Sequence, residues 1–246
     1  MLYNRTCKPK NINMKIIFRM LVLGIVLISC NEKNKKNKIE ESKIVTDKEL
    51  TKDISNLIDS LYIVDQKIQS DAMKAGNNGE TEKMHELIAE QLVIFERHIP
   101  ILKNIYDMIG YPTIEQVGKE SARKYFTLVQ HSDADIKFQE KMLVEITKEV
   151  KKGNMNGENF ALLTDRVQLA QNKPQVYGTQ LNYDINIGHA YPINLIDSIN
   201  VNARRENIGI EPIEKYLNKS IEVHFQMNKV HYDKIGIKEP KLYKTK

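Results

Sequence analysis

The chain has 246 residues, a formal net charge of +5 and only two cysteines. This length is enough for one domain with a sizeable core. The charge excess comes from residues 1–29, which hold five of the 37 basic residues and none of the 32 acidic ones. The remainder is neutral and gives no support for nucleic-acid binding. Since Cys7 and Cys30 are the only cysteines, no disulfide or thiol nucleophile is expected after residue 30.

Residues 1–29 have the features of a secretory signal. Lys15 and Arg19 precede an apolar stretch, and the run Leu27-Ile28-Ser29-Cys30 resembles the lipobox of a bacterial lipoprotein. The apolar stretch is far shorter than the roughly 20 residues of a membrane-spanning helix. We therefore expect cleavage before Cys30, lipidation of Cys30 and anchoring to a bacterial membrane. The protein would lie in the cell envelope, facing away from the cytoplasm; inner and outer membranes both remain open.

Residues 31–44 are polar, rich in lysine and without periodicity, so we expect the lipidated cysteine and a disordered tether over 30–45. A single mainly helical domain is expected over 46–246. Its first helix is predicted to begin at a capping box formed by Thr46 and Glu49. The apolar stripe of this helix is expected to consist of Leu50, Ile54, Leu57, Ile58, Leu61, Val64, Ile68 and Ala72. A second helix is predicted to start near Thr81, and Pro100 should kink it or split it.

Three further helices are predicted over 115–130, after a cap at Asp135, and over 158–171. The composition then changes. Residues 175–181 are predicted to be extended and to pair with 185–193 as a hairpin. Two last helices are expected near 198–207 and 212–232. The expected fold is mainly α: a bundle of about six to seven helices with one small β-hairpin near residues 175–193.

Three polar clusters interrupt the apolar pattern of these elements. They are Gln130-His131-Ser132-Asp133, then Asp165-Arg166, and then Gln175, Tyr177 and Gln180 around Gly178. The order and spacing of the residues in these three clusters resemble those of an uncharacterised bacterial domain family that is often carried on secreted or lipidated proteins. The resemblance extends from about Gly110 to Tyr216 and includes Arg204-Arg205. It points to these residues but implies no reaction.

His131 is the candidate for proton transfer, because imidazole titrates near neutral pH and either Asp133 or Asp165 could orient it. The competing interpretation is a buried histidine bonded to a backbone carbonyl at a helix end. Asp133 could equally be a helix cap. Gln139 falls on the inward stripe of its helix, where a structural hydrogen bond is favoured.

Asp165 and Arg166 are neighbours on a helix, so their side chains point about 100° apart and cannot pair with each other. A structural salt bridge is the default for both, with Asp133 as the expected partner of Arg166. For Gln175, Tyr177 and Gln180, ligand contact and a structural hydrogen-bond network are equally open. Arg204 and Arg205 could clamp an anion or pair with Glu206 and Glu211, and the ion pairs are the preferred interpretation. His224 is expected to be a core residue.

These expectations meet in one hypothesis, a concave polar pocket. Its catalytic candidates are His131, Asp133 and Asp165, and its ligand-binding candidates are Gln130, Arg166, Gln175, Tyr177 and Gln180. The preferred function is a binding or interaction domain for a small molecule, a peptide or an envelope protein. The alternatives are a metal-free hydrolase, in which Arg166 or Tyr177 stabilises negative charge, and a structural envelope protein. No metal or cofactor motif is present, so neither is expected.

Overall fold

The computed structural model describes residues 32–245. The chain divides into two units, Met1–Val45 and Thr46–Lys246, and the packing described below belongs to the second. The predicted signal over 1–29 and the predicted lipidation site Cys30 lie outside the described residues.

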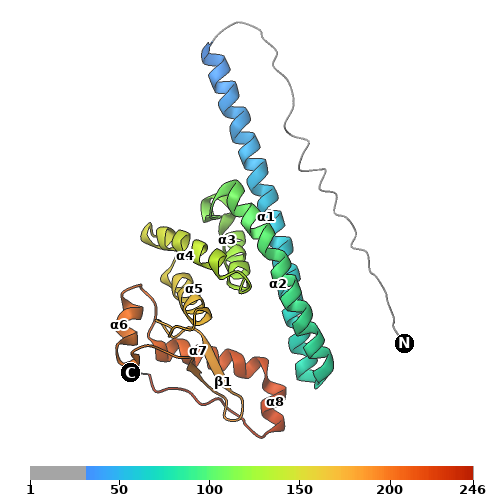
Figure 1. Cartoon of the computed structure of the whole chain (residues 1–246), viewed down its shortest axis with the longest axis vertical. Helices are drawn as coiled ribbons and strands as arrows, with labels where there is room; N and C mark the ends of the chain where they lie inside the picture. Colours follow the sequence, from blue (N-terminus) through green and yellow to red (C-terminus); the bar gives the residue numbers. More distant parts are fainter. Residues whose placement is uncertain (1–31, 246) are drawn as a thin grey trace, which may run out of the picture. The chain divides into compact units, whose positions relative to one another are not determined.

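The described part of the chain is mainly helical (Figure 1). Its elements are α1 (Glu32–Asn78), α2 (Thr81–Ile109), α3 (Ile114–Gln130), α4 (Ile136–Lys151), α5 (Gly157–Ala170), β1 (Leu181–Asp184), β2 (His189–Pro192), the 3₁₀ helix η1 (Ser198–Asn200), α6 (Val201–Glu206), α7 (Ile213–Met227) and α8 (Lys229–Lys234). The predicted fold class, mainly α with one small antiparallel hairpin, is confirmed.

The first helix begins earlier than the sequence pattern predicted. α1 starts at Glu32, so the expected start at Thr46 is wrong and residues 32–45 are helical where a disordered tether was expected. This stretch contains neither glycine nor proline and is rich in lysine and glutamate, which have high helix propensity. The absence of an apolar period in this stretch therefore did not exclude a helix. None of the described helices is long and apolar enough to cross a membrane.

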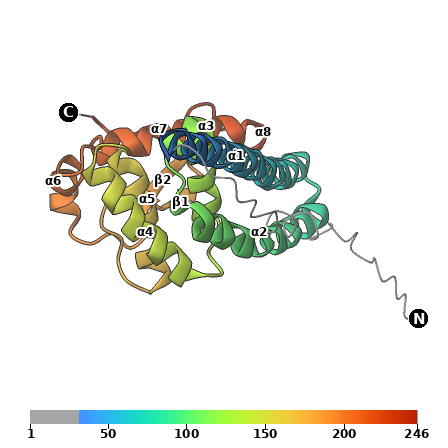
Figure 2. The ribbon, with the colours of Figure 1, turned by 90° about the horizontal axis from the view of Figure 1, so that it is seen from above.

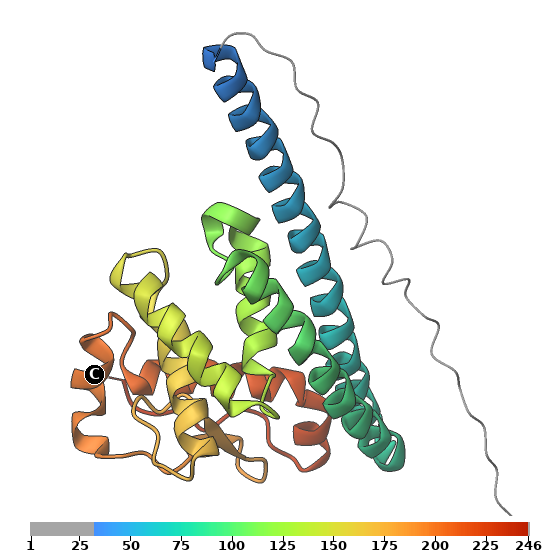
Figure 3. The same ribbon diagram turned by 45° about the horizontal axis from the view of Figure 1, so that its top comes forward.

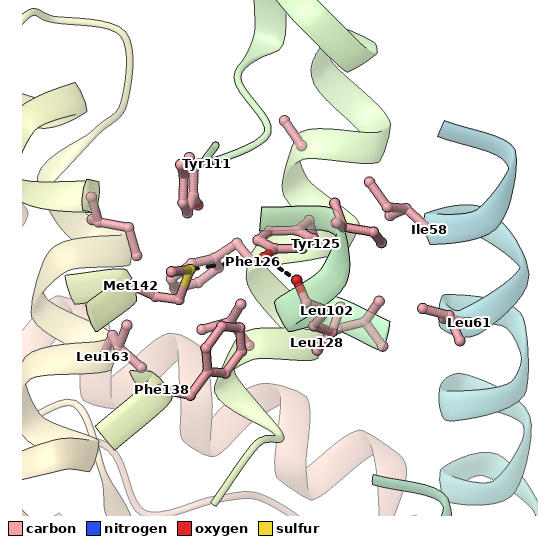
Figure 4. Close-up of a cluster of buried hydrophobic side chains, with 14 of the residues drawn as sticks. Ile58, Leu61, Leu102, Tyr111, Tyr125, Phe126, Leu128, Phe138, Met142 and Leu163 are labelled. Atoms are coloured by element: carbon pink, nitrogen blue, oxygen red, sulfur yellow. Dashed lines mark hydrogen bonds between the residues drawn. The ribbon is translucent and has the colours of Figure 1, made fainter. Parts of the chain in front are cut away.

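The main core lies where α1 to α5 meet (Figure 4). Ile58 and Leu102 are fully buried there, and the Tyr125 hydroxyl donates to the Leu102 carbonyl at 3.0 Å. The α1 segment after Thr46 runs alongside α2 (Figures 2 and 3). α2 continues through Pro100 without splitting, since burial of side chains on both sides of the proline offsets its cost of about 3 kcal/mol.

The helix starts in the middle of the chain follow local capping chemistry. Thr113 and Gln116 form a capping box at α3, and Gly118, at φ +80°, breaks the helical geometry near its start. The Asp135 side chain accepts the Phe138 N–H at 3.0 Å, so the predicted cap of α4 is confirmed. Asn156 caps α5 in the same way.

The C-terminal third packs around a second, smaller core of Ala190, Val201, Ile213, Leu217 and Ile221. The strands β1 and β2 pair antiparallel, from Leu181 opposite Pro192 to Asp184 opposite His189. The expected strand over 175–181 is wrong before Leu181, where the structure has only one isolated bridge, from Gln175 to Leu195. The expected last helix is broken at Asn228, where α7 ends and α8 follows.

Candidate functional site

Residues 175–180, here called the Asp165 loop, are held by one carboxylate. Asp165 on α5 is fully buried and accepts the backbone N–H groups of Val176 at 2.7 Å, Tyr177 at 2.9 Å and Thr179 at 2.8 Å. It also accepts the Thr179 hydroxyl at 2.8 Å. Charge-assisted bonds of this kind are about twice as strong as neutral ones. Because these N–H groups are committed to Asp165, the loop cannot form the predicted strand.

The carbonyl groups of the Asp165 loop are bound from the other side. Arg204 Nε donates to the Val176 carbonyl at 2.8 Å, and Arg205 Nη1 donates to the Tyr177 carbonyl at 2.7 Å. The Tyr216 hydroxyl donates to the Thr179 carbonyl at 2.7 Å. The loop is therefore fixed from α5, α6 and α7 together, which is a structural role for Asp165.

The ion pairs expected for these two arginines are wrong. Arg204 faces Asp197, with Nη1 and Oδ2 3.5 Å apart, and also donates to main-chain carbonyls. Arg205 Nε donates to the Glu211 main-chain carbonyl at 2.7 Å rather than to its carboxylate. The Glu211 carboxylate is bound by Lys219 instead, at 2.6 Å. Both arginines are thus committed to carbonyl oxygens of tight loops.

Gln175 closes the same network. Its side chain is buried, donates to the carbonyls of Gln180 (2.9 Å) and Ile193, and accepts the Gln180 N–H at 2.9 Å. All of these partners are main-chain groups, which favours the structural interpretation of Gln175. Tyr177 is half-buried, and its ring meets Phe160 edge to face at 5.9 Å.

Arg166 connects the first polar cluster with this loop. Its Nε donates to the Gln130 carbonyl at 2.7 Å and to Asp133 Oδ1 at 2.9 Å, and its Nη1 faces Gln180 Oε1 at 3.4 Å. The expected pair with Asp133 is present, although the Asp133 side chain is 59% exposed. Gln139, fully buried, also donates to Asp133 Oδ1, at 3.0 Å.

His131 lies at a different meeting point, at the end of α3. Its Nδ1 is 2.7 Å from Oδ2 of Asp65, a fully buried carboxylate on α1. The orienting acid is therefore neither Asp133 nor Asp165, because those two are occupied by Arg166 and by the Asp165 loop. The His131 ring stacks on Phe95 at 4.6 Å and its side chain is 19% exposed. Within the described residues, its Nε2 makes no hydrogen bond.

Asp65, Phe95, His98 and His131 form a cluster that is here called the His131 junction. Oδ1 of Asp65 accepts the side-chain amides of Gln66 at 2.8 Å and Gln69 at 2.7 Å. His98 on α2 is buried, and its Nδ1 has no partner among the described residues. Burial lowers the pKa of His98, while the nearby Asp65 carboxylate acts in the opposite direction.

Asp65 was missed in the sequence analysis, yet the sequence carries a signal for it. The buried stripe of α1 runs through Ile58, Leu61, Asp65, Ile68 and Ala72. An acid at helical spacing within such a stripe requires a buried partner. The sequence analysis placed Val64, the residue before Asp65, on the buried stripe, but Val64 is exposed in the structure.

The predicted site residues fall into two separate groups, one around Arg166 and the Asp165 loop and one around His131, and two pockets of the described chain lie elsewhere. One, the Arg205 pocket, has a volume of about 660 Å³. It is lined by Asn156, Glu158, Thr179, Tyr183, Arg205, Gly209, Ile210, Glu211, Tyr216, Lys219, Ser220, Val223, His224 and Met227. The other, of about 450 Å³, lies beside α3 and includes Gln130. Neither contains His131 or Tyr177, so neither is the single polar pocket expected from the sequence.

Within the described residues, no group of three or more potential His, Cys, Asp or Glu metal ligands is brought together. Neither a curated protein nor a solved structure matches the chain. Residues 52–228, which include both polar networks and the Arg205 pocket, match DUF6624, a family of unknown function, and the chain belongs to that family.

Proposed function

We propose that this protein is a lipid-anchored protein of the bacterial cell envelope whose domain binds a small molecule in the Arg205 pocket. One observation carries the binding proposal. The Arg205 side chain borders the pocket and is only 2% exposed, yet no carboxylate oxygen of the described residues lies within 4.0 Å of its nitrogens. A buried charge without a close counter-charge is costly unless a partner arrives.

The dimensions and walls of the pocket support the same proposal. A volume of about 660 Å³ falls within the range of roughly 300–1,000 Å³ usual for small-molecule sites. The Tyr183 ring, stacked on His224 at 4.0 Å, provides an aromatic wall, and Ile210 and Val223 provide apolar surface. A few polar groups within largely apolar walls are the usual composition of a ligand site.

A ligand screen with a blocked variant tests the binding proposal. Thermal shifts are measured with a library of small organic molecules for the native domain and for Val223→Trp, which fills the pocket mouth. Val144→Trp on α4 is the matched control, because both valines are exposed on helices and only Val223 lines the pocket. We expect stabilising compounds that lose their effect in Val223→Trp and keep it in Val144→Trp. Equal shifts in both variants, or no shift with any compound, contradict the proposal.

The anchoring part of the proposal has its own test. The lipobox ending at Cys30 and the acid-free segment before it support a cleaved and lipidated N-terminus. Intact-mass measurement of the protein purified from its native membrane is expected to give a chain that begins at a lipidated Cys30. An unmodified chain that retains residues 1–29 contradicts the anchor and leaves the ligand site unaffected.

A second candidate function, a metal-free hydrolase, is favoured by the Asp65–His131 pair. Asp65 fixes the Nδ1 side of the ring, and the opposite Nε2 makes no bond among the described residues. Nε2 could therefore take a proton from water as the water oxygen attacks an ester carbonyl, and the leaving alcohol would receive that proton. We would expect His131→Ala to lower p-nitrophenyl acetate hydrolysis about 100-fold or more. Equal rates in the native domain and the variant exclude this candidate.

A further inference from the structure

The guanidinium of Arg205 has two sides with different environments. On one side, Nε donates to the Glu211 carbonyl at 2.7 Å and Nη1 donates to the Tyr177 carbonyl at 2.7 Å. Nη2 has no hydrogen bond among the described residues. The group lies over the Tyr216 ring, 5.0 Å from its centroid, and borders the pocket. The hydrogen bonds to the carbonyls of Glu211 and Tyr177 therefore use only some of the five N–H donors of this side chain.

The charge of Arg205 is compensated only at a distance, by the carboxylates of Glu211, Asp165 and Glu158. Asp165 and Arg205 hold opposite sides of the same loop, through the N–H and the carbonyl of Tyr177. Burial lowers the pKa of Arg205, the direction expected for a cation withdrawn from water without an adjacent anion. An arginine nevertheless stays protonated in proteins, so a positive charge borders the pocket at all ordinary pH values.

The other charged groups of the pocket leave that position open. Lys219 and Glu211 pair with each other at 2.6 Å. Glu158 lies exposed on the wall and makes no ion pair within the described part of the chain. Tyr216, whose pKa burial raises to about 12, stays neutral and donates to Thr179. The strongest unmet demand in the pocket is thus for an acceptor with negative charge, beside apolar surface.

We propose that the Arg205 pocket recognises an organic anion, whose carboxylate or phosphate head group pairs with the free edge of the Arg205 guanidinium while its apolar body lies between Tyr183 and Val223. The planar donor fork of arginine suits both head groups. This inference rests on the proposed function, since it names the ligand class of the same pocket.

A matched set of probes tests the ligand class on the unmodified domain. Calorimetry is performed with 3-phenylpropionate, phenyl phosphate and the neutral 3-phenylpropionamide. We expect the amide to bind at least tenfold more weakly than the better anion, because a hydrogen bond to a charged group contributes about 1.5–3 kcal/mol. The ratio of the two anions distinguishes a carboxylate site from a phosphate site. Equal binding of amide and anions overturns the anion inference while the pocket remains a ligand site. No binding of any probe overturns both.

Two variants and a control test whether the preference for an anion over the amide depends on Arg205. Arg205→Gln should abolish the preference for the anion over the amide. Arg166→Gln is the matched control, because Arg166 also donates to a main-chain carbonyl but does not line the pocket. Since Arg205→Gln could unfold the domain, Glu158→Gln provides a second measurement on an exposed residue. Removing this negative charge from the pocket wall should strengthen anion binding a few-fold and leave amide binding unchanged. Anion affinity unchanged by both Glu158→Gln and a folded Arg205→Gln contradicts the proposal.

Discussion

The Asp165 loop and the His131 junction each contain one fully buried aspartate, and the two carboxylates are used in opposite ways. Asp165 accepts three backbone N–H groups and one hydroxyl of a single loop. Asp65 accepts only side-chain partners, namely Gln66, Gln69 and His131. Backbone donors cannot turn away, whereas side chains can rotate or exchange protons. The comparison separates a carboxylate that determines the fold from one positioned to act on another side chain.

The largest expected effect comes from replacing the two aspartates by asparagine. Asp165→Asn turns an NH₂ group towards backbone donors that have no other partner, and each buried donor left unpaired costs about 1–3 kcal/mol. We expect a loss of more than about 3 kcal/mol of unfolding free energy. Asp65→Asn should cost only about 1 kcal/mol, because His131 and the glutamine amides can reorient. Urea melts of both variants measure the difference, and equal losses would remove the distinction between the two regions.

A glycine pair tests how tightly the Asp165 loop is packed. Gly178 has φ +74°, and a Cβ there would lie 2.5 Å from Ile213 Cδ1. Gly209 has φ +71°, and a Cβ there would meet nothing within 4 Å. Both alanine variants pay about 1–2 kcal/mol for the left-handed backbone, but only Gly178→Ala also displaces a core side chain. We expect Gly178→Ala to cost about 1 kcal/mol more in thermal or urea unfolding. A smaller loss of unfolding free energy for Gly178→Ala than for Gly209→Ala would show that the Asp165 loop can shift away from Ile213 at little cost.

The pH dependence of stability is expected to come from the His131 junction. Burial lowers the pKa of His98 below its ordinary value of 6.5. The unfolded chain therefore binds more protons than the folded one as the pH falls through this value, and stability decreases towards pH 5. One such histidine contributes at most about 1.4 kcal/mol per pH unit. Urea melts between pH 7.5 and pH 5 should show a shallower decline for His98→Leu. An unchanged decline would assign the effect elsewhere, for example to His224, whose pKa burial also lowers.

The contrast between the regions also explains which features could be predicted from the sequence. The helices of the core follow apolar periodicity and local caps such as Asp135, so their positions were readable. The polar clusters were recognised by residue type, and the pairing of Arg166 with Asp133 followed from helix geometry. The partner of His131 could not be predicted, because Asp65 lies 66 positions away in the sequence. In addition, Val64 had been placed on the buried stripe of α1 in the position that Asp65 occupies. The Arg205 pocket depends on loops around Gly209, whose tertiary placement no local pattern encodes.

The smallest expected effect concerns the link between the two regions. Arg166 lies between them, since it binds Asp133 and the carbonyl of Gln130, the residue before His131, and it faces Gln180 in the Asp165 loop. Side-chain exposure of 27% for Arg166 and 59% for Asp133 places their ion pair largely in solvent, where such pairs contribute about 0.2–1 kcal/mol. A double-mutant cycle of Arg166→Ala and Asp133→Ala in urea should therefore give a coupling energy below about 1 kcal/mol that decreases further at high salt. A coupling of several kcal/mol, insensitive to salt, would instead show that this ion pair is shielded from solvent and firmly joins α5 to the turn after α3.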